Sequence, residues 1–573
     1  MRKYILLFIL AVVALSLRLY RLDARGLITD EKFTLLNANG FWVGGANQSA
    51  FKKDYFTAAD FWEEKGVRDY LDASAHADFG THMVHNTVLH YWMKAFGNSD
   101  YSVRLPGTLF NVLTVILLFL LVLKYFGSYR MAFLAGLFLA VDPLNVAQSH
   151  IARSYPLSFF LITLSTEYFI RIVRREASVK NFVIYTLLVA LALLNHYINF
   201  FIPLAHGLIF LVLRHKKQLW PGFIAAAAFN ALLLFYWFNW GGGYTAIGFL
   251  KDKNELHRKI AENQNDDLSM TIQKSTPDLI IKKAISLYYD IGVLGHGLFD
   301  RVKGVKVFLS SFLFFAAVML AVQYKKRVWV RYGSVVLALL ILALQATYIT
   351  GILVSAGIFV ILYFAWKALR ESYVFESEKG QFVWLMTGFL MLVLPVLFVV
   401  NDAYSNGNTT SLTHRYIGNA SPFVVILIAV GMVRAADFRF GFLLWMAFIT
   451  VVQAGSIRKG LNDYFADRSV YNAWFVPARV SNPYRQVAER LQEQAMPGDT
   501  VLIPGAYKDK YQERFNPDME ISYKDAQFLN LYLSKDFTVP QRVDPQEREK
   551  LYLKRESGEK VLIFDFKGEE YRY

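Results

Sequence analysis

Cysteine is absent from this 573-residue sequence. Disulfide bonds, thiolate catalysis and zinc–thiolate sites are therefore excluded, and any metal would need histidine or carboxylate ligands. Internal repeats and low-complexity tracts are lacking too. What is abundant is apolar, since 55% of the residues are hydrophobic and the chain holds 48 Phe and 33 Tyr. This content exceeds what a soluble core needs and predicts a protein that sits in lipid.

Apolar runs of about 15 to 22 residues recur along the chain, close to the roughly 20 residues with which a helix crosses the hydrocarbon core. We count about thirteen such runs. The first, from Tyr4 to Tyr20, resembles a signal peptide, yet the similar runs that follow favour an uncleaved first span. The others begin near Pro106, Met131, Tyr155, Asn181, Asn199, Leu219, Val305, Gly333, Gly351, Gln381, Ser421 and Phe440.

The formal net charge of +15 indicates membrane orientation rather than a nucleic-acid partner, because basic residues gather in cytoplasmic loops. Basic clusters mark every second loop, and we expect that side, with the N-terminus, to be cytoplasmic. The opposite, outer side then receives loops at about 21–104, 241–304 and 401–419, together with the C-terminus. The clusters are Arg2–Lys3, Lys124–Arg130, Arg171–Lys180, Arg214–Lys217, Lys325–Arg331, Lys367–Lys379 and Arg434–Arg439.

Two domains are expected. Residues 1–454 should form a mainly α, polytopic transmembrane helical bundle with large outer loops. Residues 455–573 should form a small α/β domain on the outer side, because helical VAERLQEQAMPGD precedes strand-like TVLIPG and KVLIFDF. This second domain carries no catalytic signature, and we expect it to cap the membrane domain or to help bind an acceptor.

Asp30 and Glu31 lie only some ten residues beyond the first span, where a polar loop meets the lipid surface. A carboxylate there can act as a general base that takes a proton from an acceptor hydroxyl. The alternative is a solvated acidic pair or a helix N-cap.

A family resemblance joins these carboxylates to later motifs. Asp30-Glu31, the helix ending LHYWMKAFGNSDYSVRLPG and the later IARSYP together resemble the GT-C superfamily of glycosyltransferases that use polyprenyl-phosphate sugars. Within this superfamily the chain resembles bacterial protein O-mannosyltransferases and the aminoarabinose transferase of lipid A. The resemblance extends to about residue 200 and recurs at SLTHRYIGNASP. The first loop departs from it, with Gly80-Thr81-His82-Met83 where relatives often carry a proline turn.

The resemblance implies inverting transfer of a sugar from a polyprenyl-phosphate carrier to an acceptor hydroxyl, at the outer face of a bacterial plasma membrane. It assigns Asp30 as the base and Glu31 as a residue that orients Asp30 or the acceptor. No cofactor is expected, and no nucleic-acid partner. Protein, lipid A, O-antigen and exopolysaccharide stay open as acceptors.

The leaving group would be a lipid phosphate, so cationic and hydrogen-bonding side chains should converge on it near the outer surface. An arginine that flanks a span can instead be a snorkelling anchor. The candidates for the donor phosphate are Arg104, Arg153, Tyr155, Arg415 and Tyr416, and those for acceptor or sugar contacts are His82, His85, His150 and His414.

A metal site is conceivable in the first loop, which holds His76, Asp78, His82 and His85. His82 and His85 would share one face of a helix whose other face is apolar and aromatic. That spacing is more typical of an interfacial helix, so we expect no metal and keep a divalent cation as the alternative.

A transporter or flippase of lipid-linked saccharides is the main rival function, followed by a polysaccharide polymerase or ligase. Transporters commonly place ionisable residues near the bilayer midplane, whereas here the spans are largely free of charge. Glu167 is the clearest exception and falls nearer the cytoplasmic end. In the second outer loop, DLIIKKAISLYYD fits an amphipathic surface helix whose Lys282 and Lys283 attract lipid.

Overall fold

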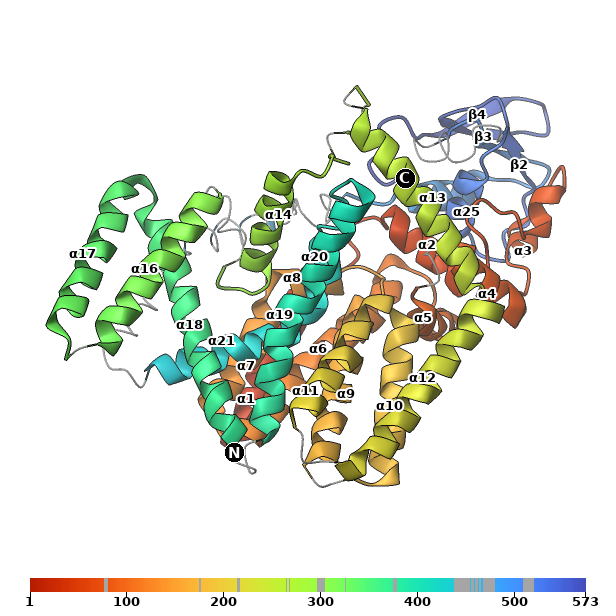
Figure 1. Ribbon diagram of the computed structural model, residues 1–573. Helices are drawn as coiled ribbons and strands as arrows, with labels where there is room; N and C mark the ends of the chain where they lie inside the picture. Colours follow the sequence, from red (N-terminus) through yellow and green to blue (C-terminus); the bar gives the residue numbers. More distant parts are fainter. Residues whose placement is uncertain are drawn as a thin grey trace.

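The computed structural model describes residues 1–573 except 77–80, 175–176, 214–216, 264, 267, 270, 296–303, 325, 375–378, 437–453, 455–457, 459–461, 463–464, 467–479, 509–519 and 573. Helices dominate, and one small sheet stands near the C-terminus (Figure 1). The helices of the membrane part and its loops are α1 (Arg2–Leu19), α2 (Thr29–Ala38), α3 (Ala58–Phe61), α4 (Val67–His76), α5 (Met83–Phe96), α6 (Asp100–Phe126), α7 (Tyr129–Val141), α8 (Pro143–Ser149), α9 (Tyr155–Val173), α10 (Val179–Asn195), α11 (Phe201–Val212), α12 (Trp220–Trp240), α13 (Gly243–Glu262), α14 (Pro277–Asp290), α16 (Val305–Gln323), α17 (Val328–Leu344), α18 (Ile349–Val374), α19 (Lys379–Asn406), α20 (His414–Ile417) and α21 (Ser421–Ala436).

Within the described residues, seven helices are long and apolar enough to cross a membrane, or eight if the bent pair α7–α8 counts as one span. Three shorter apolar helices accompany them. The predicted polytopic helical class is confirmed, but the count of about thirteen spans is not. The span expected from Phe440 lies outside the described residues.

Local signals explain where α6 begins and ends. The side chain of Ser99 accepts a hydrogen bond from the backbone N–H of Ser102 and caps the helix, and Gly127, with φ 63°, ends it. Between them lies an apolar stretch that suits the bilayer. Arg104 therefore stands in the first turns of α6, near the N-terminal end of that helix.

The chain near the C-terminus forms the predicted α/β unit. Its elements are α23 (Pro483–Gln494), β1 (Thr500–Pro504), α25 (Lys524–Asn530), β2 (Gln541–Asp544), β3 (Lys550–Lys554) and β4 (Lys560–Asp565). The strand order is β2-β1-β3-β4, with β1 and β2 parallel and the other pairs antiparallel. The two stretches read as strands, TVLIPG and KVLIFDF, are β1 and β4.

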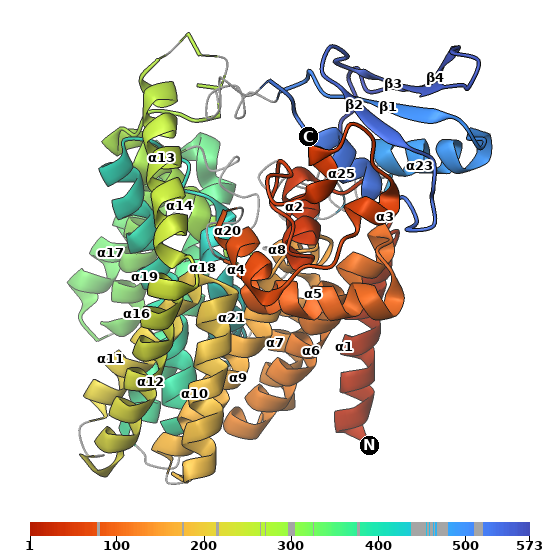
Figure 2. The ribbon, with the colours of Figure 1, turned by 90° about the vertical axis from the view of Figure 1, so that its right-hand side faces the viewer.

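The first outer loop and this C-terminal unit share one hydrophobic core. Leu35, Phe41 and Phe61 of the loop belong to the same buried cluster as Val501 and Phe528. Phe56 also pairs in antiparallel fashion with Gln541 at the edge of the sheet. Figure 2 shows the sheet above α2 and α3, which in turn cover the outer ends of the bundle. Because it shares a core with the loop that contains Asp30, the C-terminal unit packs as one body with that loop and is not a separate cap on the membrane helices.

The second and third outer loops also pair with each other. Lys274 forms an antiparallel bridge with Asn408, and the Nζ of Lys283 donates to Thr409 Oγ1 at 2.7 Å. The predicted amphipathic segment is α14, and α13 precedes it along the edge of the molecule (Figures 1 and 2). These contacts bring α13 and α20 to the same side of the bundle as α2.

Candidate functional site

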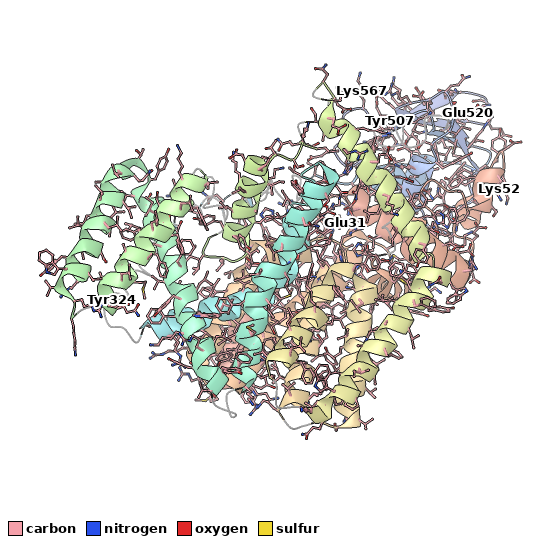
Figure 3. All side chains as sticks on the ribbon, in the orientation of Figure 1. Glu31, Lys52, Tyr324, Tyr507, Glu520 and Lys567 are labelled. Carbon is pink, nitrogen blue, oxygen red and sulfur yellow. The ribbon has the colours of Figure 1, made fainter. Side chains whose placement is uncertain are left out.

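Helix α2 presents three consecutive ionisable residues in three directions, because neighbouring residues of an α-helix are about 100° apart around its axis. Asp30 and Glu31 lie in its first turn, where carboxylates favour the helix dipole. The carboxylate of Glu31 also accepts a hydrogen bond from the backbone N–H of Ile28 at 3.0 Å, which caps the helix. Figure 3 shows Glu31 where the bundle meets the C-terminal unit.

Glu31 is fully buried and its carboxylate is saturated with donors. Arg104 donates to both oxygens, from Nε at 2.8 Å and from Nη2 at 3.0 Å. Arg25 adds a bond at 3.1 Å, and the backbone N–H of Ala152 adds one at 2.9 Å. Burial alone would raise the pKa of Glu31, but Arg104, Arg25 and the hydrogen bonds lower it to about 2. Glu31 therefore holds the loops around α2 together, and its carboxylate is closed off from solvent.

Arg104, which is predicted to bind the donor phosphate, is engaged by groups of the protein itself. Its guanidinium is fully buried, and besides the bonds to Glu31 it donates to the carbonyl oxygens of Leu22, Arg25 and Gly26 at 2.8–2.9 Å. A guanidinium has five N–H donors, and all five are accepted within the protein. Arg104 is thus a structural partner of Glu31, and no donor is left for a ligand.

Asp30, the neighbour of Glu31, is in the opposite situation. Its side chain is 47% exposed. Its Oδ2 lies 4.0 Å from Nη2 of Arg153 and 3.9 Å from Nη1 of Arg415, both longer than a charge-assisted hydrogen bond. Burial would raise the pKa of Asp30, but Arg153, Arg415 and Lys253 outweigh it and lower the pKa below its ordinary value. Asp30 is consequently an ionised carboxylate that attracts cations without being locked to them.

Arg153 comes from the short segment between α8 and α9 and is nearly buried. Its Nη1 donates to the backbone oxygen of Asp30 at 3.1 Å and to Thr34 Oγ1 at 2.9 Å. Thr34 lies one helical turn beyond Asp30 and itself donates to the same backbone oxygen. Arg153 therefore fixes α2 while it presents positive charge beside the Asp30 carboxylate.

Arg415 reaches the site from α20. Its side chain is 27% exposed, its Nη2 lies 3.3 Å from the hydroxyl of Tyr416, and the guanidinium stands 5.0 Å from the centre of that ring. Its neighbour His414 is bound elsewhere, with Nε2 2.7 Å from Oδ2 of Asp290 at the end of α14. His414 thus anchors α20 to the second outer loop and does not point at Asp30. Tyr416 and Arg415 form the cationic, aromatic side of the site.

The predicted histidine contacts divide into two groups. His82 precedes α5 with φ 73°, a left-handed conformation unusual for a non-glycine residue, and its Nδ1 contacts Ser154 Oγ. Its ring stands 6.2 Å from that of Tyr155, which places both beside Arg153. His85 is buried on the inner face of α5, and burial lowers its pKa to about 3. His150 has other partners, since its Nε2 contacts the backbone oxygen of Leu17 and its own backbone oxygen accepts a hydrogen bond from Arg25.

Three groups that the sequence did not single out complete the arrangement. Lys253 on α13 is close enough to Asp30 to lower its pKa, and His257 lies one turn further along α13, with Nδ1 3.4 Å from Thr410 Oγ1. His196 packs 5.3 Å from His82 and 5.6 Å from Tyr155, between ring centres. Only the positive charge of the second outer loop hinted at Lys253, and nothing local pointed to His196.

The resulting site holds one exposed carboxylate among three cations, Arg153, Arg415 and Lys253. The excess of positive charge suits an anionic group such as a phosphate, and the aromatic and imidazole side chains suit a polar ring. Among the described residues, no group of three or more histidine or acidic side chains is arranged to hold a metal ion. Asp78, part of the conceivable metal set, lies outside the described residues.

Comparison with known proteins gives one family. Residues 82–240, less than half of the chain, match the model of the dolichyl-phosphate-mannose-protein mannosyltransferase family. This match confirms the resemblance to GT-C glycosyltransferases of the protein O-mannosyltransferase kind. Comparison with the curated proteins gave no match.

Several solved structures are similar over nearly the whole chain. ArnT from Cupriavidus metallidurans, in its apo state, shares 12% identity, with a TM-score of 0.35, over 92% of this chain and 84% of that one. The same protein bound to undecaprenyl phosphate shares 12% identity, with a TM-score of 0.35, over 92% of this chain and 85% of that one. The Archaeoglobus fulgidus oligosaccharyltransferase shares 14% identity, with a TM-score of 0.41, over 93% of this chain but only 58% of its own length.

Proposed function

We propose that this chain is a membrane glycosyltransferase that moves a sugar from a polyprenyl-phosphate carrier to an acceptor hydroxyl at the outer face of a bacterial plasma membrane. The observation that carries the proposal is the setting of Asp30, half exposed and ionised, with two guanidinium groups 3.9 and 4.0 Å away that do not lock it. The family match supports the same class of reaction. In this orientation the N-terminus is cytoplasmic and the C-terminal unit is outside.

The cations beside Asp30 are suited to the phosphate of the donor. Negative charge on that phosphate grows as the bond to the sugar breaks, and positive groups already in place stabilise it. Lys253 approaches from the second outer loop, Arg415 from the third, and Arg153 from the segment between α8 and α9. Because Arg415 is partly exposed, it is the cation best placed to exchange its weak contact with Asp30 for a phosphate oxygen.

The same exchange prepares Asp30 to act as the base. In the structure its pKa is lowered by Arg153, Arg415 and Lys253, which makes it a weak proton acceptor. A bound phosphate neutralises those cations, so the pKa of Asp30 rises toward a more useful value. The acceptor oxygen then attacks the anomeric carbon. The bond between that carbon and the phosphate oxygen breaks, and the hydroxyl proton passes to Asp30. Displacement in line inverts the anomeric centre and leaves polyprenyl phosphate.

The test is turnover of radiolabelled sugars carried on undecaprenyl and dolichyl phosphate, beginning with mannose, with membrane extract as the source of acceptors. Wild-type protein should transfer label, and Asp30→Asn should lose at least about a hundredfold in kcat. Asp23→Asn, an exposed carboxylate of the same loop, is the matched control and should behave as wild type.

Two results would overturn the proposal. If the wild type binds these lipids but transfers no sugar from any of them, the chain is a transporter or flippase. If Asp30→Asn transfers at the wild-type rate, Asp30 is not the base.

A further inference from the structure

Lys32, the third member of the Asp30-Glu31-Lys32 triplet, points away from the site. Two residues along a helix correspond to about 200° of rotation, so Lys32 and Asp30 lie on opposite faces of α2. The Lys32 side chain is fully buried and enters the C-terminal unit. A lysine amine is rarely buried without a specific set of partners.

The partners of Lys32 come from three segments of the C-terminal unit. Its Nζ donates to the backbone oxygens of Tyr571 and Arg572, the latter at 3.3 Å. The amine also stands 4.8 Å from the ring centre of Tyr484 and 4.7 Å from that of Phe528, distances typical of cation–π contacts. The C-terminal unit therefore contacts α2 through the Lys32 side chain at four of its residues.

The segment that receives Lys32 is itself held firmly. The guanidinium of Arg572 pairs with Asp525, from Nη2 to Oδ2 at 2.8 Å and from Nε to Oδ1 at 3.2 Å. The ring of Tyr571 packs so closely on Gly26 that a Cβ there would lie 2.7 Å from it. Residues 571–572 thus contact both α2 and the loop that leads into it, and we call this segment the plug.

The position of α2 decides where Asp30 stands. Glu31 ties one face of the helix to Arg104, and Arg153 holds the backbone oxygen of Asp30 itself. The plug supports the remaining face through Lys32. A displacement of about 1 Å at a reacting group can reduce turnover roughly a hundredfold. A contact that prevents such a displacement is important for the chemistry although it touches no substrate.

We propose that Lys32 is a positioning residue for sugar transfer, and that the C-terminal unit acts through it to hold α2 and Asp30 in place. This inference rests on the proposed function and goes beyond it, because it gives the C-terminal unit a part in turnover. Burial lowers the pKa of Lys32 to about 7, despite the opposing effect of Asp525, Asp100 and Glu31. Burying the Lys32 amine therefore carries a desolvation cost that an apolar side chain at this position would not incur.

The experiment compares full-length wild type with Lys32→Met, Lys32→Gln and Tyr571→Ala. Methionine keeps the volume and removes the donor, glutamine keeps a shorter neutral donor, and the tyrosine variant loosens the plug from its own side. Lys535→Met is the matched control, because Lys535 is an exposed lysine of the C-terminal unit that contacts the Trp62 ring at 6.0 Å and does not reach α2.

We expect Lys32→Met and Tyr571→Ala to lower kcat about 10- to 100-fold while the KM for the lipid donor changes less than about threefold. Lys32→Gln should lie between methionine and wild type, and the control should match wild type. Rates are expressed per folded enzyme, measured by gel filtration of the purified protein. A kcat within twofold of wild type in both Lys32 variants would overturn the inference.

Amide hydrogen exchange supplies a readout that needs no activity. Lys32→Met should exchange the amides of residues 28–38 about tenfold faster than wild type, whereas those of α6 and α9 should be unchanged. Unchanged exchange in residues 28–38 overturns the inference even if activity falls. If exchange rises as expected but the wild type transfers no sugar, it is the proposed function that fails, and with it the catalytic part of the inference.

Discussion

Replacing Glu31 by glutamine should destabilise the protein rather than disable its chemistry. The carboxylate accepts hydrogen bonds from Arg104, Arg25 and the backbone N–H groups of Ile28 and Ala152, all away from solvent. A glutamine amide has only one acceptor oxygen. Its NH₂ group would face the N–H donors that now bind the second carboxylate oxygen, and those donors would lose their acceptor. Arg104 and Arg25 would also lose the charged carboxylate to which both guanidinium groups are hydrogen-bonded.

Two independent routes give a similar magnitude. Breaking a buried ion pair by removing one partner destabilises proteins by about 3–5 kcal/mol. The pKa of Glu31 falls from 4.5 to about 2, which corresponds to about 3 kcal/mol of stability at neutral pH. If the first loop and the C-terminal unit unfold together as a unit of 150–250 residues, Tm should fall by roughly 6–12 °C.

The assay is thermal unfolding of purified protein in detergent, with Glu64→Gln as the control because Glu64 is an exposed carboxylate of the same loop. A depressed carboxyl pKa stabilises the folded protein above about 4.5, and that contribution is lost as the pH falls toward about 2. The difference in Tm between wild type and Glu31→Gln should therefore shrink across this window. A variant with the wild-type Tm at pH 7 but no transfer would refute the reasoning and place Glu31 at the substrate.

Three further substitutions, at Arg415, His414 and Asp290, probe the cationic side of the site. Arg415→Gln should raise the donor KM roughly tenfold to a hundredfold, the value of one charge-assisted contact. It should also move the acid limb of the kcat/KM profile to higher pH, because Asp30 of the free enzyme loses a cation that lowers its pKa. An unmoved limb would show that Arg415 does not act on Asp30. His414→Gln and Asp290→Asn should each weaken donor binding, and the double variant should be no worse than either alone, since both break one contact. Additive losses would contradict this pairing.

Hydropathy and charge determined much of the architecture without any structure. Long apolar runs separated by basic clusters predict a polytopic helical protein, and the alternation near the C-terminus predicts the α/β unit that the structure contains. These features are local, because the periodicity of a helix or strand and the signals at its ends lie within its own stretch of sequence. The pairing of Asp30 with Arg153 and Arg415 was also within reach, once all three were assigned to the outer surface.

Which charge meets which was decided only by the tertiary structure. Asp30 and Glu31 are indistinguishable as neighbours in the sequence, yet α2 directs one toward open space and the other into a buried pair with Arg104. Lys32 finds its partners some 540 positions further along the chain. A buried ion pair depends on how separate elements dock, and docking is set by the packing of whole helices and sheets. Local pattern therefore predicts where ionisable residues gather, and only packing decides which of them remain open to a substrate.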